Sequence, residues 1–140
     1  MPAMTRREAR EEALRLLFET GFHGDETPET IYQRACEDRE FENLPYIRTV
    51  YFGVLEHQDE LDELIARHSS GWRPDRIAPV TRCILRLSVF EMLYVKDVPL
   101  TVALNEAIEL VKKYDEEKLR AFVNGVLNGV KQELEQRNPS

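Results

Sequence analysis

The chain has 140 residues, of which 42% are hydrophobic and 32% charged, a balance typical of one folded domain spanning residues 1–140. Its formal net charge of −7 argues against a surface that is basic all over, as a general nucleic-acid coat would be, and leaves room only for a local basic patch. The two cysteines lack C-x-x-C spacing, which predicts free thiols and no zinc site. No apolar signal segment opens the chain and no apolar run approaches the ~20 residues of a membrane span, so we expect a cytoplasmic protein.

Apolar residues recur at helical spacing throughout, and no segment alternates as a strand would, which predicts an all-α fold. Thr5 and Glu8 fit a capping box at the start of the first helix. The join at residues 56–58 leaves open one kinked helix instead of two, and a short helical turn is expected within residues 72–78. The seven predicted helices lie at about residues 6–20, 28–38, 45–55, 59–68, 80–95, 99–114 and, after a cap at Asp115, up to 135.

Three arginines stand at the beginning of the first predicted helix. At 100° per residue, Arg6, Arg7 and Arg10 border the packed face of this helix and lie opposite its glutamates. The helix macrodipole disfavours positive charge at this end, so local helix stability does not explain the arginines. A phosphate partner would explain them, because guanidinium groups match phosphate oxygens. The alternative is pairing within the chain, for example between Arg7 and Glu11.

A second basic segment lies near the start of the last predicted helix, at residues 118–125 (KLRAFVNG). Its two cations, Lys118 and Arg120, precede the aromatic ring of Phe122 and the amide of Asn124. Bases of single-stranded RNA stack on aromatic rings while neighbouring cations hold the backbone. A phenylalanine in a helix is, however, more often part of the core, so both interpretations of Phe122 stay open.

Glu91 falls on the apolar side of the central predicted helix, where a carboxylate is costly unless it is paired or hydrogen-bonded. We expect a structural link to another helix, with a general acid of raised pKa as the alternative. No second carboxylate, histidine or nucleophile is suitably spaced with it. His23, His57 and His68 stand in polar or loop contexts without ligand spacing and are expected at the surface. No catalytic residue, metal or cofactor is therefore predicted.

Four segments together, in order and spacing, resemble the NusB family of bacterial transcription antitermination factors. They are residues 5–10 (TRREAR), Leu85-Arg86 followed by Glu91, Val98-Pro99 followed by Asn105-Glu106-Ala107 and Lys112, and residues 122–127 (FVNGVL). The resemblance spans nearly the whole chain. It implies two small helical bundles that share a central helix, and a protein that is not an enzyme.

The resemblance also implies partners. Members of this family pair with NusE, a small-subunit ribosomal protein, and bind the boxA element of ribosomal RNA leader transcripts, which helps RNA polymerase to read through terminators. Carried over to this sequence, the RNA contacts fall on Arg6, Arg7, Arg10, Lys118, Phe122 and Asn124. The NusE contacts fall on Arg76, Ile77, Val80, Thr81 and Ile84.

The first helix departs from the family pattern because Glu8, Glu11 and Glu12 reduce its basic character. We therefore expect weak RNA affinity for the isolated chain and a larger contribution from the partner. The alternative to RNA binding is a helical scaffold that binds only protein, including a second copy of itself as a homodimer.

Overall fold

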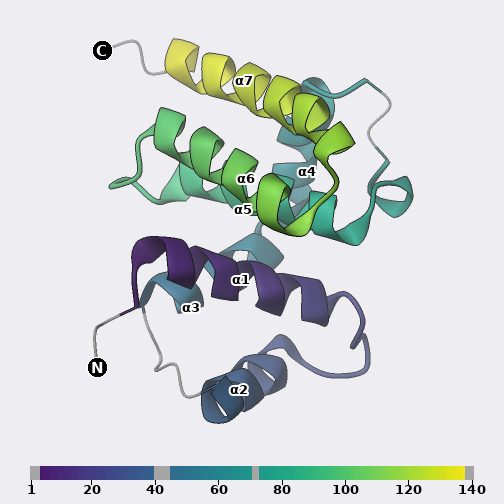
Figure 1. Ribbon diagram of the computed structural model, residues 1–140, viewed down its shortest axis with the longest axis vertical. Coiled ribbons are helices and arrows are strands. Elements are labelled where there is room, and N and C mark those ends of the chain that lie inside the picture. The colour runs from purple at the N-terminus through teal and green to yellow at the C-terminus, as the bar shows by residue number, and fades with distance from the viewer. Residues whose placement is uncertain (1–3, 40–44, 71–72, 138–140) are drawn as a thin grey trace. The chain divides into compact units, whose positions relative to one another are not determined.

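The computed structural model describes residues 4–39, 45–70 and 73–137, and every regular element in these ranges is helical, which confirms the all-α class (Figure 1). The chain divides into two compact units, Met1–Glu56 and His57–Ser140. None of the helices in the described ranges is long and apolar enough to cross a membrane. The elements are α1 (Arg6–Thr20), α2 (Pro28–Arg39), α3 (Pro45–Glu56), α4 (Gln58–Arg67), the 3₁₀ turn η1 (Pro74–Arg76), α5 (Pro79–Tyr94), α6 (Leu100–Tyr114), the 3₁₀ turn η2 (Glu117–Leu119) and α7 (Arg120–Arg137).

In the first unit, α1 packs against α2 and α3. The predicted capping box is present: the backbone N–H of Glu8 donates to Thr5 Oγ1 at 3.1 Å, and the N–H of Thr5 donates to Glu8 Oε1 at 3.0 Å. Gly21 follows the last turn. The buried residues of α1 include Ala9, Ala13, Leu16 and Leu17, which recur at helical spacing.

Tyr51 on α3 is the largest fully buried side chain of this unit. Its hydroxyl lies 2.6 Å from Thr20 Oγ1, and the Thr20 hydroxyl donates to the carbonyl of Leu16 at 2.8 Å. Its ring stacks on that of Tyr32, with centroids 5.9 Å apart. Burial raises the pKa of Tyr51. The phenol thus ties α3 to the last turn of α1 through a neutral hydrogen-bonded network.

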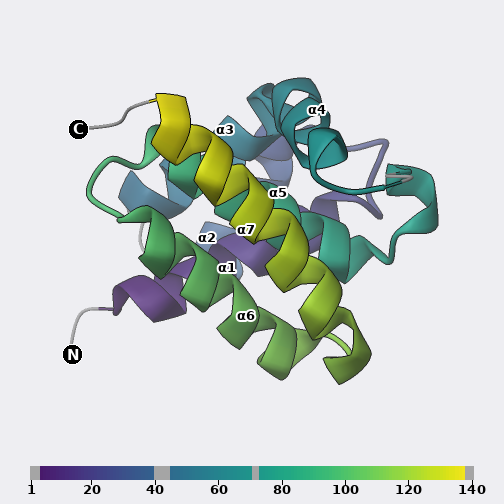
Figure 2. The same ribbon diagram turned by 90° about the horizontal axis from the view of Figure 1, so that it is seen from above.

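In the second unit, α5 packs against α4, α6 and α7, in keeping with its apolar residues on most sides (Figure 2). The guanidinium of Arg86 donates two hydrogen bonds of 2.8 Å to the carboxylate of Asp62, which joins α5 to α4. Helices α6 and α7 lie side by side, and α7 returns along α6 after η2. This hairpin carries Asn105-Glu106-Ala107 and Lys112 of the third family-like segment on α6, and the fourth segment, residues 122–127, on α7.

The approach of α7 to the end of α4 is very close at Gly129. A Cβ atom there would lie 2.6 Å from His68 Nδ1, so only glycine fits without displacing the ring. His68 Nε2 lies 2.7 Å from Glu133 Oε1, and Arg67 Nη2 donates to Glu133 Oε2 at 2.7 Å. The prediction that His68 is a plain surface residue is therefore wrong, because its ring is a half-buried part of the α4–α7 contact.

Two boundaries refine the predicted elements. Residues 56–58 do not continue one helix, since α3 ends at Glu56 and α4 begins at Gln58. The prediction that Asp115 caps the last helix is wrong, because η2 intervenes and α7 begins only at Arg120. Asp115 instead ends α6, where its backbone is extended. The expected turn within 72–78 is confirmed as η1, although Trp72 lies outside the described residues.

Candidate nucleic-acid interface

The three arginines of α1 differ in exposure. Arg6 and Arg7 are exposed, whereas Arg10 is only 2% exposed. The guanidinium carbon of Arg6 lies 4.5 Å from the ring centroid of Tyr46 on α3, and that of Arg10 lies 5.8 Å from the same centroid. Cations over an aromatic face are attracted by its quadrupole. Arg6 and Arg7 therefore present charge to solvent, and Arg10 is held in the packed part of the structure.

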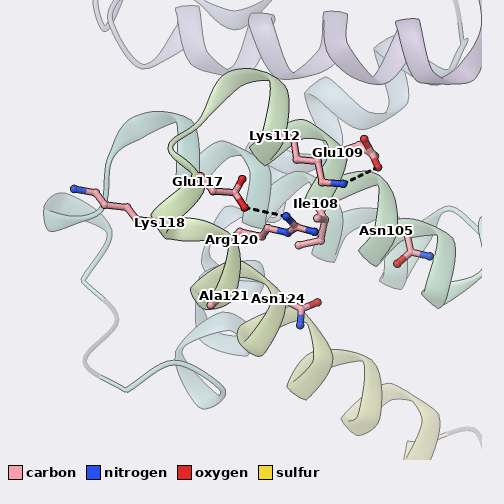
Figure 3. Close-up of a pocket in the computed structure, with 9 residues that line it drawn as sticks. All are labelled: Asn105, Ile108, Glu109, Lys112, Glu117, Lys118, Arg120, Ala121 and Asn124. Carbon is pink, nitrogen blue, oxygen red and sulfur yellow. Dashed lines mark hydrogen bonds and ion pairs between the residues drawn. The ribbon is translucent and has the colours of Figure 1, made fainter.

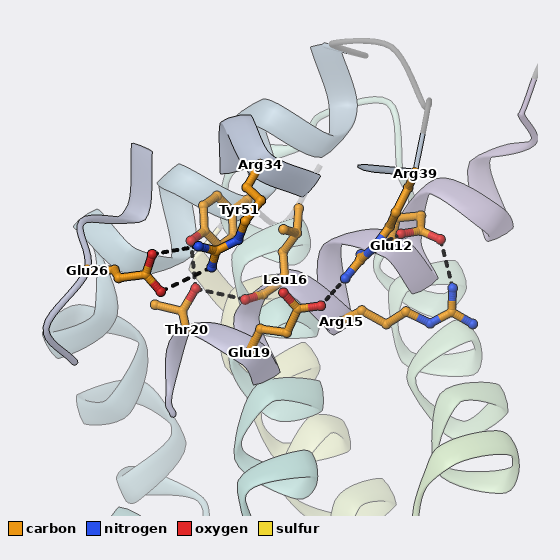
Figure 4. A network of polar contacts seen from close by, with 9 residues as sticks. All are labelled: Glu12, Arg15, Leu16, Glu19, Thr20, Glu26, Arg34, Arg39 and Tyr51. Atoms are coloured by element: carbon orange, nitrogen blue, oxygen red, sulfur yellow. Dashed lines mark hydrogen bonds and ion pairs between the residues drawn. The ribbon is translucent and has the colours of Figure 1, made fainter. Parts of the chain in front are cut away.

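The acidic side of α1 is bound largely by other arginines (Figure 4). Glu12 accepts from Arg15 Nη1 at 2.7 Å and from Arg39 Nη1 at 2.9 Å, and Glu19 accepts from the same Arg39 guanidinium. Arg15 belongs to α1 itself and Arg39 to the end of α2. Glu12 and Glu19 thus hold α1 to α2 through Arg39.

The second unit contains a groove of about 820 Å³ lined by α6, η2 and the first turns of α7 (Figure 3). Three cationic and two acidic side chains line it, together with two amides and two apolar side chains. The side chains that line the groove thus carry more positive than negative charge, although the net charge of the whole chain is −7. Figure 3 shows the ammonium group of Lys118 at the outer edge, pointing away from the other side chains. The lining residues are Asn105, Ile108, Glu109, Lys112, Glu117, Lys118, Arg120, Ala121 and Asn124.

The cations of the groove make ion pairs with carboxylates close by in sequence, and both members of each pair are well exposed to solvent. Exposed pairs of this kind contribute about 0–1 kcal/mol each, because water screens them and long side chains lose entropy. A phosphate can therefore take the place of the carboxylate at small cost. The pairs are Lys112–Glu109 at 3.5 Å, Lys118–Glu116 at 3.2 Å and Arg120–Glu117 at 2.9 Å.

Of the site residues predicted in this segment, Lys118 and Asn124 line the groove. Phe122 is half-buried, between the exposed Ala121 and the buried Val123. Its ring is neither a full member of the core nor open to solvent over its whole surface. Burial alone therefore leaves both interpretations of Phe122 standing.

Three further groove residues were not predicted as site residues, namely Asn105, Lys112 and Arg120. Each lies within a segment that the sequence analysis singled out. Their signal was the recurrence of amides and cations in two motifs, at residues 105–112 and 118–125. Only the return of α7 along α6 shows that the two motifs line one groove.

The residues predicted to contact NusE lie at η1 and the start of α5 and differ in accessibility. Arg76 is exposed, and Ile77 and Val80 are half-buried. Thr81 and Ile84 are 0% exposed, so the prediction that their side chains form part of a contact surface does not fit this structure. Residues 80, 81 and 84 lie on the same side of α5, so the difference comes from what packs over each residue and not from helical periodicity.

Glu91 is 1% exposed and is not one of the residues that line the groove. Its position favours the structural role over the general acid, since a substrate could not reach it there. Burial also raises the pKa of the Cys83 thiol to about 11, so this thiol is a poor nucleophile at neutral pH. Within the described ranges, no group of three or more metal-ligating side chains comes together.

By its fold, the protein is a small all-helical protein of two compact units, the second of which has a groove lined by more cations than carboxylates. Residues 7–132 match the model of the NusB family, and the chain belongs to this family.

Named relatives and solved structures agree with this assignment. The transcription antitermination protein NusB of Bacillus subtilis (strain 168) is 45% identical over 133 residues, which cover 95% of this chain and 99% of that protein. The protein of the same name from Bacillus pumilus (strain SAFR-032) is 46% identical over 134 residues, which cover 96% of this chain and 100% of that protein. Among solved structures, T. maritima NusB superposes with a TM-score of 0.85 at 33% identity and covers 94% of both chains. A crystal structure of the antitermination factors NusB and NusE in complex with dsRNA matches with a TM-score of 0.79 at 30% identity, covering 91% of this chain and 96% of that one.

Proposed function

We propose that this protein is a transcription antitermination factor that binds boxA-type single-stranded RNA of ribosomal RNA leader transcripts together with NusE. The complex promotes read-through by RNA polymerase in the cytoplasm, and the protein catalyses no reaction. Support comes from membership of the NusB family and from relatives that carry the name of an antitermination protein. A similar solved structure, of NusB and NusE in complex with dsRNA, supports the choice of NusE and RNA as partners.

The observation that carries the proposal is the groove between α6 and the start of α7, whose lining has more cations than carboxylates in an anionic chain. Phosphates of the RNA displace the weak ion pairs of Lys112, Lys118 and Arg120. The amides of Asn105 and Asn124 offer donors and acceptors to the edges of unpaired bases. These two kinds of contact give affinity and sequence preference respectively.

The other predicted RNA residues take different roles. Arg6 and Arg7 are exposed on α1 and meet RNA phosphates. Arg10 is buried and acts by keeping α1 packed close to Tyr46. Phe122 offers the exposed part of its ring to a base.

For NusE, we propose a surface formed by Arg76, Ile77 and Val80, which combines one charge with two partly exposed apolar side chains. A partly apolar patch of this kind suits a protein partner. NusE binding raises RNA affinity because it adds contacts and orders both surfaces before the RNA arrives. We regard the two compact units as parts of one functional domain over residues 1–140.

The test is a titration of boxA RNA and of a scrambled RNA with the protein, with and without NusE. We expect boxA to bind more tightly than the scrambled sequence and NusE to strengthen binding. The matched variants are Lys118→Ala in the groove and Lys131→Ala on α7, whose ammonium pairs with Glu135 at 3.2 Å and does not line the groove. Equal RNA affinity of the two variants would remove the groove from the proposal. Sedimentation with and without RNA separates a complex with RNA from a homodimer or a scaffold that binds only protein.

A further inference from the structure

Thr81 is a buried polar side chain that the proposed function leaves unexplained. It lies in the first turns of α5 and is 0% exposed. Its hydroxyl donates a hydrogen bond of 2.6 Å to Oδ2 of Asp115. The length is that of a strong hydroxyl–carboxylate bond, and the partner lies 34 residues further along the chain. Thr81 therefore fixes one particular point of a distant segment.

That point is the place where the chain leaves α6. Asp115 follows the last residue of α6, and its N–H donates to the carbonyl of Val111 at 2.9 Å. Its second carboxylate oxygen, Oδ1, accepts from the backbone N–H of Glu116 at 2.8 Å. One carboxylate thus links α5 to the backbone that turns from α6 into η2. The direction in which η2 starts depends on both hydrogen bonds.

The groove is built on the two sides of this point. Lys112 precedes Asp115 by one helical turn, and Lys118 and Arg120 follow it on η2 and at the start of α7. The position at which Asp115 is held therefore determines the distance between Lys112 on α6 and the two cations that follow the turn. A guanidinium or ammonium group that moves by about 1 Å no longer meets a phosphate at hydrogen-bonding distance.

We propose that Thr81 and Asp115 are positioning residues for RNA: their hydrogen bond sets the place of the η2 cations relative to those of α6 and so the fit of the groove to RNA phosphates. The proposal rests on the proposed function, because it assigns RNA to the groove. Thr81 contacts neither RNA nor NusE in this account. It acts through Asp115 and the turn that Asp115 holds.

The experiment compares two variants that each remove one buried hydroxyl from α5. Thr81→Val removes the bond to Asp115. Ser88→Ala removes the bond from Ser88 Oγ to the carbonyl of Ala103 on α6, which is 3.1 Å long and belongs to a residue that does not line the groove. Each variant loses the hydrogen bond of one buried hydroxyl, so a purely structural role predicts a loss of folding stability and no change in RNA binding for either.

The positioning role predicts a difference between the two. Thr81→Val should weaken binding of boxA RNA, measured in the presence of NusE, by about 3- to 10-fold, as expected for the loss of one modest polar contact. The slope of log K against log salt should also become shallower by up to about 0.7, the value for one lost phosphate contact on single-stranded RNA. Ser88→Ala should keep both values, and Thr81→Ser, which keeps the hydroxyl, should restore them.

Wild-type affinity and salt slope in a folded Thr81→Val protein would overturn the inference and leave the proposed function intact. Failure of the wild-type protein to bind boxA RNA with NusE would overturn both. Hydrogen exchange of the amides at residues 116–120 gives a readout without RNA. Exchange there should be faster in Thr81→Val than in Ser88→Ala, and equal rates would contradict the positioning role. If Thr81→Val does not fold, Asp115→Ala replaces it, since it removes the acceptor oxygens of both hydrogen bonds.

Discussion

The cations of α1 and those of the groove carry the same charge but are held in different ways. On α1, Arg6 and Arg10 lie against the ring of Tyr46, and Arg10 is buried. In the groove, Lys118 and Arg120 pair with carboxylates and stay exposed. An aromatic ring fixes a guanidinium without neutralising it, whereas an exposed carboxylate neutralises a cation only weakly.

This difference distinguishes two roles of a cation in an RNA-binding protein, namely packing within its own unit and binding of a phosphate. A buried arginine contributes mainly to the packing of its own unit, through its methylene groups and its ring contact. An exposed cation beside a carboxylate contributes little to folding and is available to a phosphate. The comparison therefore predicts which substitutions affect stability and which affect RNA binding.

The largest expected effect belongs to Arg10→Ala. Removal of its buried methylene groups and its contact with Tyr46 should lower the free energy of unfolding by about 2–4 kcal/mol. Arg7→Ala, at an exposed position of the same helix, should change it by less than about 0.5 kcal/mol. Urea unfolding of the two variants measures both values. Similar small losses for both arginines would break the distinction drawn for α1.

Phe122→Ala comes next. Because the ring is half-buried, its loss should weaken RNA binding by about 1–3 kcal/mol, the range for one base stacked on an aromatic side chain. The titration must be paired with an unfolding curve of the same variant. A loss of about 3–5 kcal/mol in folding stability would instead assign Phe122 to the core.

A further prediction concerns Glu133, whose cationic neighbours in the second unit are expected to stabilise the fold and not to bind RNA. Hydrogen bonds from Arg67 and His68, and then the charges of Arg67 and Arg137, lower the pKa of Glu133 to about 2. Because the pKa is depressed in the folded state, the ionised carboxylate stabilises the fold above its ordinary pKa of 4.5, and this stabilisation is lost as the pH falls from about 4.5 through 2.

The matching variant is Glu133→Gln. After allowance for solvent screening of a partly exposed cluster, it should be less stable than the wild-type protein by about 1 kcal/mol at neutral pH. The difference should shrink as the pH approaches 2, because the wild-type carboxylate is then protonated. Unfolding free energies at pH 7 and near pH 2 measure it. A difference that stays constant with pH would show that the charge of Glu133 contributes nothing.

The smallest effects concern single exposed cations. Arg7→Ala and Lys118→Ala should each make the salt dependence of RNA binding shallower by about 0.7, the value for one phosphate contact. Lys131→Ala, outside the groove, should leave the slope unchanged. An unchanged slope in Lys118→Ala, with a changed slope in Arg7→Ala, would assign the phosphate contacts to α1 and remove them from the groove.

The local features followed from the sequence because they depend on neighbours in the chain. The capping box needs only Thr5 and Glu8, three residues apart, and both of its hydrogen bonds form. The role of Asp115 at the end of α6 did not follow from the sequence, because an aspartate at this position is equally suited to cap the next helix. Its carboxylate is engaged by Thr81, 34 residues earlier, and no local rule includes that partner.

The candidate site shows the same division. The residue types of the C-terminal motif indicated Lys118 and Asn124, and both line the groove. Lys112 and Asn105 joined them only through the pairing of α6 with α7. The burial of Arg10 and Thr81 was likewise missed, since periodicity gives the direction of a side chain but not what covers it.

The sequence by itself determined the helical class, most helix boundaries and the family, because propensity, capping and motif order are all properties of neighbouring residues. Tertiary structure alone decided which cations are buried, which line the groove and what holds the turn between α6 and α7. The physical reason is that burial and long-range hydrogen bonds depend on groups far away in the chain, whose approach is fixed by the packing of whole helices.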